Sequence, residues 1–137
     1  MTTRRYLRFT ALMILGSALP VLAHHSVTAE FDPNKRITLK GTVTKVDWQN
    51  PHIFFHIDVK DASGKITSWE LQSLPPAFFR GSGLTRQKIL ADTEEVTVTA
   101  YPAKDGTAAY GYLLTLSYPD GRSFNLSREG VTAPPAK

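Results

Sequence analysis

The sequence predicts an all-β domain, a small Greek-key barrel of OB type with five to six strands and one short helical connection. Short stretches of alternating apolar and polar residues recur along the chain, and turn-forming residues separate them. Three such stretches precede a segment with helical features and two or three follow it, which is the element order of a small OB-type barrel. A β-sandwich is the alternative, because both folds consist of alternating strands at short spacing.

The first part of the domain predicts two strands joined by a turn. Residues 26–31 are expected to form a strand that ends at the Asp-Pro-Asn-Lys turn of residues 32–35. A longer strand is expected over residues 37–48, and Gly41 within it predicts a bulge or a sharp bend. This bend favours a closed barrel, because a strand that serves both halves of a barrel must bend.

The middle of the chain predicts a hairpin. Asn50-Pro51 turns the chain into a strand over residues 52–59, whose odd-numbered residues are all apolar. Its even-numbered residues, which include two histidines, are expected on the opposite face. An Asp-Ala-Ser-Gly turn at residues 61–64 then leads into a return strand over residues 66–73.

The second half predicts the helical connection and the last strands. Thr85 is expected to cap a short helix that ends near residue 90. Strands are expected over residues 95–101, 110–118 and 122–126. The sequence thus predicts a single domain over residues 24–130, followed by a disordered tail of residues 131–137 that contains two prolines.

Residues 1–23 have the features of an export signal. Three arginines lie near the start, and residues 9–19 form an apolar segment shorter than the roughly 20 residues of a membrane-spanning helix. Residues of small or modest size precede a cleavage site after Ala23. We therefore expect a periplasmic or secreted protein without a membrane span after cleavage. An uncleaved anchor is the alternative, and the paired arginines leave the export route open between the general and the twin-arginine pathway.

Loss of the leader changes the chemistry of the chain. Three of its 16 basic residues leave with the leader, so 13 remain against 12 acidic residues, a net charge of +1. A charge this close to zero argues against nucleic acid as a partner. Both methionines lie in the leader and the chain has no cysteine, so the mature protein would have no sulfur ligand for a metal.

Cleavage after Ala23 would make His24 the N-terminal residue, with His25 behind it. A terminal histidine offers its α-amine and its imidazole together, and the amine, whose ordinary pKa is about 7.7–8.0, yields its proton to a metal near neutral pH. One further imidazole would complete a nitrogen-only set of the type that Cu(II) prefers. His52 and His56 are the candidates, and as residues of one strand they would be roughly 13 Å apart, too far to share one ion.

The segments around these histidines resemble a known family. The resemblance lies in the His-His-Ser segment at residues 24–26, residues 41–48, the Asn-Pro-His segment at residues 50–52 and residues 96–106. They are similar to those of a family of small exported bacterial proteins, the domain of unknown function 6152 (DUF6152), over nearly all of the mature chain. The resemblance implies a compact β fold in the cell envelope and no established activity.

The resemblance and the strand register favour different histidines as the third ligand. The resemblance points to His52, which belongs to the shared Asn-Pro-His segment. Pairing of residues 26–31 with the next strand would instead place His24 opposite Val43 and bring His56 nearer. We favour His52 and keep His56 as the alternative to it.

Together, these observations predict a monomeric exported binding protein with one Cu(II) or another transition-metal ion on His24, His25 and His52. No catalytic residue is expected, because the chain has no nucleophile-elbow motif and no phosphate-binding loop. Copper-dependent redox activity is a weaker alternative. Two further classes of function stay open: a structural or protein-interaction module of the envelope, and a metal-free binder of a small ligand or glycan.

Overall fold

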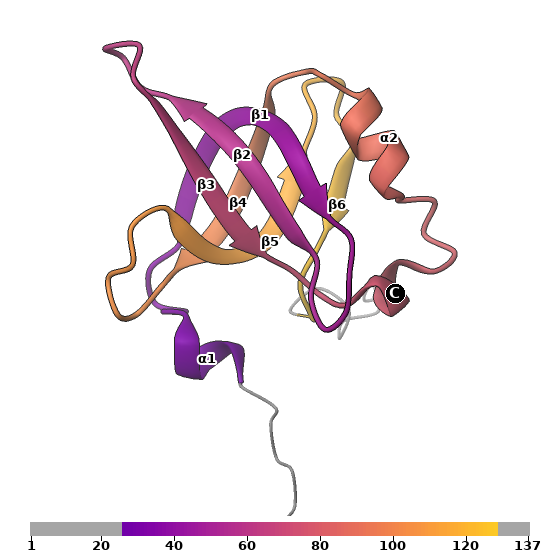
Figure 1. Ribbon diagram of the computed structural model, residues 1–137, viewed down its shortest axis with the longest axis horizontal. Helices are drawn as coiled ribbons and strands as arrows, with labels where there is room; N and C mark the ends of the chain where they lie inside the picture. The colour runs from indigo at the N-terminus through magenta and orange to yellow at the C-terminus, as the bar shows by residue number, and fades with distance from the viewer. Residues whose placement is uncertain (1–25, 129–137) are drawn as a thin grey trace, which may run out of the picture.

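A closed β-barrel forms the body of the protein in the computed structural model, which describes residues 26–128 (Figure 1). The sheet order is β3-β2-β1-β4-β5-β6, and parallel pairing of β3 with β5 closes a five-stranded barrel from which β6 extends. The strands are β1 (Ile37–Asp47), β2 (Phe54–Lys60), β3 (Ile66–Gln72), β4 (Val96–Pro102), β5 (Tyr110–Ser117) and β6 (Ser123–Asn125). This confirms the all-β class and the OB-type strand order, and the barrel replaces the alternative sandwich.

The structure confirms a short helical connection between β3 and β4, at the position that the sequence predicted. It consists of the 3-10 helix η1 (Pro76–Phe79) and the helix α2 (Arg86–Ala91). The Thr85 hydroxyl accepts a hydrogen bond from the backbone N–H of Lys88 at 3.3 Å, which is the predicted N-cap. Ile89 of α2 is buried in the main core. Among the described residues, no helix is long and apolar enough to cross a membrane.

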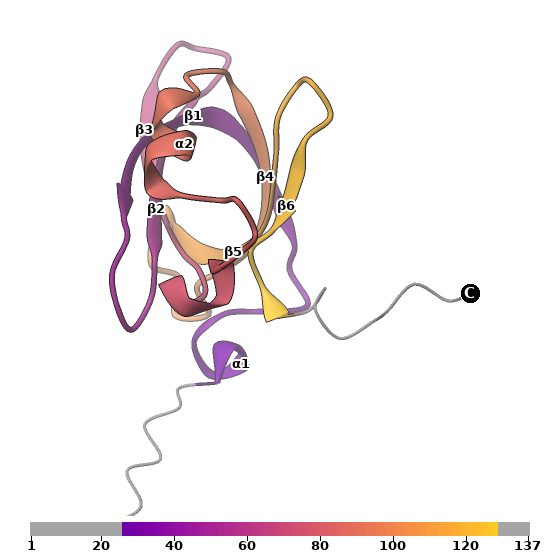
Figure 2. The same ribbon diagram turned by 90° about the vertical axis from the view of Figure 1, so that its right-hand side faces the viewer.

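The strand predicted over residues 26–31 is wrong. The chain instead forms the one-turn helix α1 (Val27–Glu30), and Phe31 makes an isolated bridge to Ala103. In the sheet, β1 pairs with β4 through its first half and with β2 through its second half. The segment before β1 packs at the end of the barrel instead (Figures 1 and 2), where the fully buried Phe31 lies against the rings of Tyr110 and Tyr112 at centroid distances of 5.4 and 5.6 Å.

Gly41 lies where β1 passes from one partner strand to the other. Gly41 is the last residue paired with β4, and Thr42 is the first paired with β2. A Cβ atom on Gly41 would lie 2.3 Å from the backbone oxygen of Asp58, so only glycine permits this approach of β1 to β2. The irregularity in pairing falls later, between Val43 and Lys45, so the predicted bulge is displaced from Gly41.

Two apolar clusters lie on opposite sides of the barrel wall. The main core fills the interior, where Ile53, Phe55 and Ile57 are fully buried, as the alternation of residues 52–59 predicted. The second cluster lies outside the barrel wall and consists of Phe31, Tyr101, Tyr112 and Leu114, with Val27 of α1 packed against it. Phe31 is fully buried there, so the second cluster ties the start of the described chain to the barrel.

We expect Gly41→Ala to destabilise the protein by about 1–3 kcal/mol, because the new methyl group would overlap the Asp58 carbonyl and push β1 from β2. Urea unfolding measures this change. Thr44→Ala, an exposed position on the same strand, serves as the matched control and should stay within about 0.5 kcal/mol of the parent. Equal stability of the two variants would contradict the close approach.

Candidate functional site

His24 and His25 lie outside the described residues. His52 and His56 are the candidate ligands that lie within them. Ser26 begins the described chain and leads directly into α1. In both views α1 lies at the same end of the barrel as the connection between β1 and β2 (Figures 1 and 2). That connection carries His52. The helix α1 therefore lies at the end of the barrel where His52 lies. Residues 27–30 form this helix and not a strand paired with β1, so the pairing from which His24 was expected opposite Val43 is absent from the described residues.

His52 is half-buried and held by one ring nitrogen. It follows the cis peptide bond between Asn50 and Pro51, and its Nδ1 lies 3.1 Å from the backbone oxygen of Ser73. A carbonyl oxygen can only accept, so Nδ1 carries the hydrogen and Nε2 of the neutral ring carries the lone pair. Metal-ligating histidines commonly donate their second nitrogen to a carbonyl or carboxylate in this way. In the neutral ring, this contact thus leaves the Nε2 lone pair available to a ligand-binding role.

His56 has a different environment on the outer face of the barrel. Its Nε2 lies 2.8 Å from Oδ2 of Asp47, and its Nδ1 lies 3.9 Å from Oε2 of Glu70. Lys45, which pairs with His56 across the strands, also reaches Oδ2 of Asp47 at 2.8 Å. Both ring nitrogens of His56 therefore face carboxylates. This histidine links β1, β2 and β3 by polar contacts.

Asp47 and Glu70 are polar partners that the sequence analysis missed. Asp58 follows His56 by two residues on the same strand, but its carboxylate accepts from the Ser68 hydroxyl. Asp47 comes close because the shift between Val43 and Lys45 changes the register of β1 against β2. The hydrogen bond from Lys45, followed by that from His56, lowers the pKa of Asp47 below its ordinary value of 3.8. A register shift in the middle of a strand leaves no signal that a single sequence could show.

A polar chain joins α1 to the sheet near both histidines. The Tyr110 hydroxyl lies 3.2 Å from Oε1 of Glu30 and 3.1 Å from Oε1 of Gln72. Gln72 pairs with Phe54, which lies two residues from His52 and two from His56. Partial burial, followed by the charge of the Glu30 carboxylate, raises the pKa of Tyr110 to about 12. This hydroxyl therefore stays protonated and serves as a hydrogen-bond donor.

The structure does not bring the two sequence-predicted histidines of the barrel into one ligand set, in agreement with their expected separation. His52 binds the chain after β3, whereas His56 binds Asp47 of β1. Within residues 26–128, no three His, Asp or Glu side chains are grouped so that they could hold a metal ion.

A match to a protein family covers most of these elements. The model of the family described as "Family of unknown function (DUF6152)" matches residues 12–111. The chain belongs to this family. The match includes all four histidines and runs from residue 12 into β5. No curated protein and no solved structure matches the chain. The chemistry of this DUF6152 protein is therefore argued from its own residues.

The aromatic residues of this DUF6152 domain lie in several different parts of the fold. Phe79 is buried and packs with Trp48 at a ring distance of 5.8 Å. Tyr112 belongs to the second cluster outside the barrel, whereas Phe78 is exposed.

We expect Lys45→Met to raise the pKa of Asp47 toward 3.8, since the hydrogen bond from Lys45 is the largest cause of its depression. His56→Phe should raise this pKa less. Because the folded pKa is depressed, the stability that Asp47 contributes is present above about pH 4 and is lost as the pH falls through its folded value. Carboxyl chemical shifts in an NMR titration measure the pKa, and an unchanged value in Lys45→Met would contradict the contact.

Proposed function

We propose that this chain is an exported binding module that holds one Cu(II) ion at its mature N-terminus. The α-amine and imidazole of His24 supply two nitrogen donors, His52 supplies the third through Nε2, and His25 is a further donor beside them. The observation that carries the proposal is the hydrogen bond from His52 Nδ1 to the Ser73 carbonyl, which leaves Nε2 with its lone pair.

The ligand chemistry favours Cu(II) over other ions. A mature chain from residue 24 has no cysteine or methionine, so nitrogen and oxygen atoms are its only donors. Imidazole and amine nitrogens suit Cu(II), which also binds such sets more tightly than the other divalent first-row ions do. The metal competes with a proton at the amine, and the ordinary pKa of about 7.7–8.0 makes this competition mild near neutral pH.

His52 fits the third position better than His56 does. Nε2 of His56 is occupied by Asp47 at 2.8 Å, so a metal there would have to displace a charged hydrogen-bond partner. Nδ1 of His56 faces Glu70 and lies on the wall of the barrel, in the middle of β2. His52 lies instead in the connection at the end of the barrel where α1 begins (Figure 1).

The proposal includes export and cleavage after Ala23, because without cleavage His24 has no free amine. A periplasmic or secreted location follows from the cationic start, the short apolar segment and the cleavage site of the leader. The N-terminal residue of the natural protein tests this part directly. Mass spectrometry should find a chain that begins at His24, and any other start would overturn the two-nitrogen chelate.

We expect the mature chain to bind one Cu(II), and His24→Ala or acetylation of the α-amine to weaken binding at least about 100-fold, since each change removes one of the two donors of the chelate. His52→Ala should weaken binding by about 10-fold or more through loss of one donor. Calorimetric titration with Cu(II), under competition from glycine, measures these affinities.

His56→Ala is the matched control for His52→Ala, because it removes an imidazole from the same part of the chain. It should leave Cu(II) affinity within about twofold of the parent. The roles of the two histidines would be reversed if His56→Ala weakened binding and His52→Ala did not. Equal affinity of the parent and the α-acetylated chain would overturn the proposed function.

A further inference from the structure

We propose that the connection between β3 and β4 is a docking surface for an anionic lipid membrane. Its exposed side chains are one aromatic ring and a group of cations, and we name them the connection surface: Phe78, Arg80, Arg86, Lys88 and Arg128. Figure 2 shows η1, α2 and the loop between them together on the side of the barrel that faces the viewer. The connection surface contains no histidine, so this inference is independent of the proposed Cu(II) site.

The connection carries positive charge that no carboxylate neutralises. Residues 71–91 contain no Asp or Glu, and the cations Arg80, Arg86 and Lys88 are all exposed. Within the part of the chain that the structure describes, none of the three makes an ion pair. Nε of Arg86 donates to the backbone oxygen of Val46 at 2.9 Å, which holds this side chain against β1 and leaves its charge in place. The connection is therefore a local source of positive potential on a domain whose charge is otherwise balanced.

Phe78 is the apolar part of the connection surface. Its side chain is 45% exposed, although the next residue, Phe79, is buried and its ring lies 5.8 Å from that of Trp48. Leu84 is buried in the same core, so the connection is fixed to the barrel at two points. The guanidinium group of Arg128 lies 4.8 Å from the centre of the Phe78 ring. The barrel thus holds an aromatic ring outward, with a cation against its face.

The backbone of the connection suits a lipid interface better than an extended peptide. Alternate backbone N–H groups donate within the connection itself, namely those of Phe78, Arg80, Ser82 and Leu84. A peptide that adds to a protein by strand pairing needs free backbone groups, whereas a segment that enters the lipid interface needs its backbone groups satisfied internally. An aromatic ring with neighbouring cations is typical of such segments, because the ring enters the headgroup region while the cations contact lipid phosphates.

Ile66, at the start of β3, provides a comparison within the same chain. Ile66 and Phe78 are the large apolar side chains that are exposed among the described residues, at 58% and 45%. The hairpin that carries Ile66 contains two cations and two acids, namely Lys60, Lys65, Asp58 and Asp61. Its charges cancel, so it attracts an anionic membrane less than the connection does. Figure 1 shows this hairpin on the opposite side of the barrel from α2.

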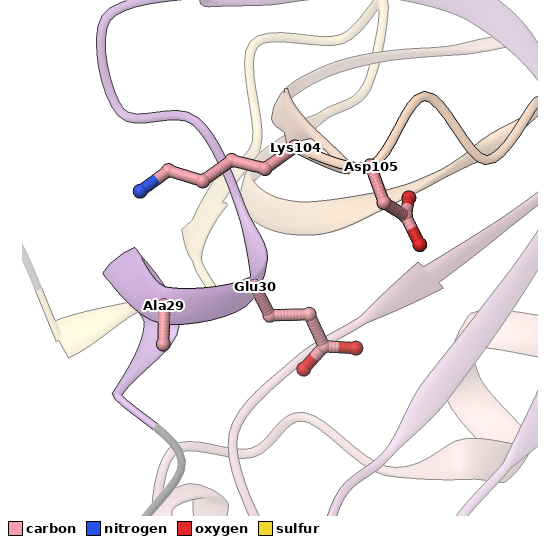
Figure 3. Close-up of a pocket in the computed structure, with 4 residues that line it drawn as sticks. All are labelled: Ala29, Glu30, Lys104 and Asp105. Carbon is pink, nitrogen blue, oxygen red and sulfur yellow. The ribbon is translucent and has the colours of Figure 1, made fainter.

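The hollow between α1 and the loop after β4 also differs from the connection surface (Figure 3). Lys104 is the cation that lines it, and the carboxylates of Glu30 and Asp105 line it as well. The Lys104 ammonium group donates to the backbone oxygen of Thr28, and its backbone N–H donates to that of Glu30 at 2.9 Å. These contacts hold α1 on the barrel, and two carboxylates outweigh one ammonium group there.

Vesicle flotation tests the proposal on the chain from residue 24, because the apolar residues 9–19 would bind lipid by themselves. This chain should bind vesicles of phosphatidylglycerol and phosphatidylcholine, bind phosphatidylcholine alone at least about 10-fold more weakly, and lose affinity as salt is raised. Arg80→Gln with Lys88→Gln should lower binding about 20-fold, since each cation near an anionic surface contributes on the order of fivefold. Lys60→Gln with Lys65→Gln removes the same charge from the hairpin and should bind nearly as the parent does.

Phe78→Ser and Ile66→Ser form a second matched pair, because each removes one exposed apolar side chain. Phe78→Ser should weaken vesicle binding about fivefold or more, since no ring enters the interface, and Ile66→Ser should stay within about twofold of the parent. Phe78→Trp should bind as the parent does. Its fluorescence, relative to that of the parent, should shift to the blue on vesicles, which reports the position of residue 78 even if Phe78→Ser folds poorly.

Three results would overturn the proposal. The first is a parent chain that does not bind the anionic vesicles. The second is equal weakening by the two double substitutions, which would show that total charge and not the connection surface governs binding. The third is binding to soluble polyglutamate that matches binding to vesicles and is unchanged in Phe78→Ser, which would assign the cations to an acidic polymer. None of these results bears on the Cu(II) site, which has its own test.

Discussion

The close approach of β1 and β2 at Gly41 is the constraint on which the rest of the structure depends. It allows one long strand to pair with β4 through its first half and with β2 through its second half. A side chain at this point would meet the backbone of Asp58, and β1 could not serve both neighbours. Closure of the barrel by β3 and β5 follows once β1 has joined the two halves.

Closure in turn decides where the start of the chain goes. The segment before β1 makes an isolated bridge from Phe31 to Ala103, and its preceding residues fold as the one-turn helix α1 at the end of the barrel. Burial of Phe31 outside the barrel wall and the two hydrogen bonds from Lys104 hold it there. Packing against the barrel thus decides the local structure of residues 27–31.

His52 and His56 are the same residue type but make different contacts in the barrel. They are four residues apart, yet His52 donates to a backbone carbonyl and His56 contacts two carboxylates. When one ring nitrogen of a neutral histidine donates to a carbonyl oxygen, the other ring nitrogen has a lone pair that can bind a metal. A histidine between Asp47 and Glu70 is drawn into polar pairing across three strands. This contrast supports His52 as the ligand in the proposed site.

The sequence by itself determined the strands after residue 37, to within one or two residues at their ends, and the capped helix at Thr85. These features follow from alternation, turns and capping, which act between residues near one another along the chain. Only the tertiary structure decided the helix at residues 27–30, the shift between Val43 and Lys45, and the partners of His56. Each of these depends on which strands meet and in what register, and pairing over long separations along the chain leaves no local pattern in a single sequence.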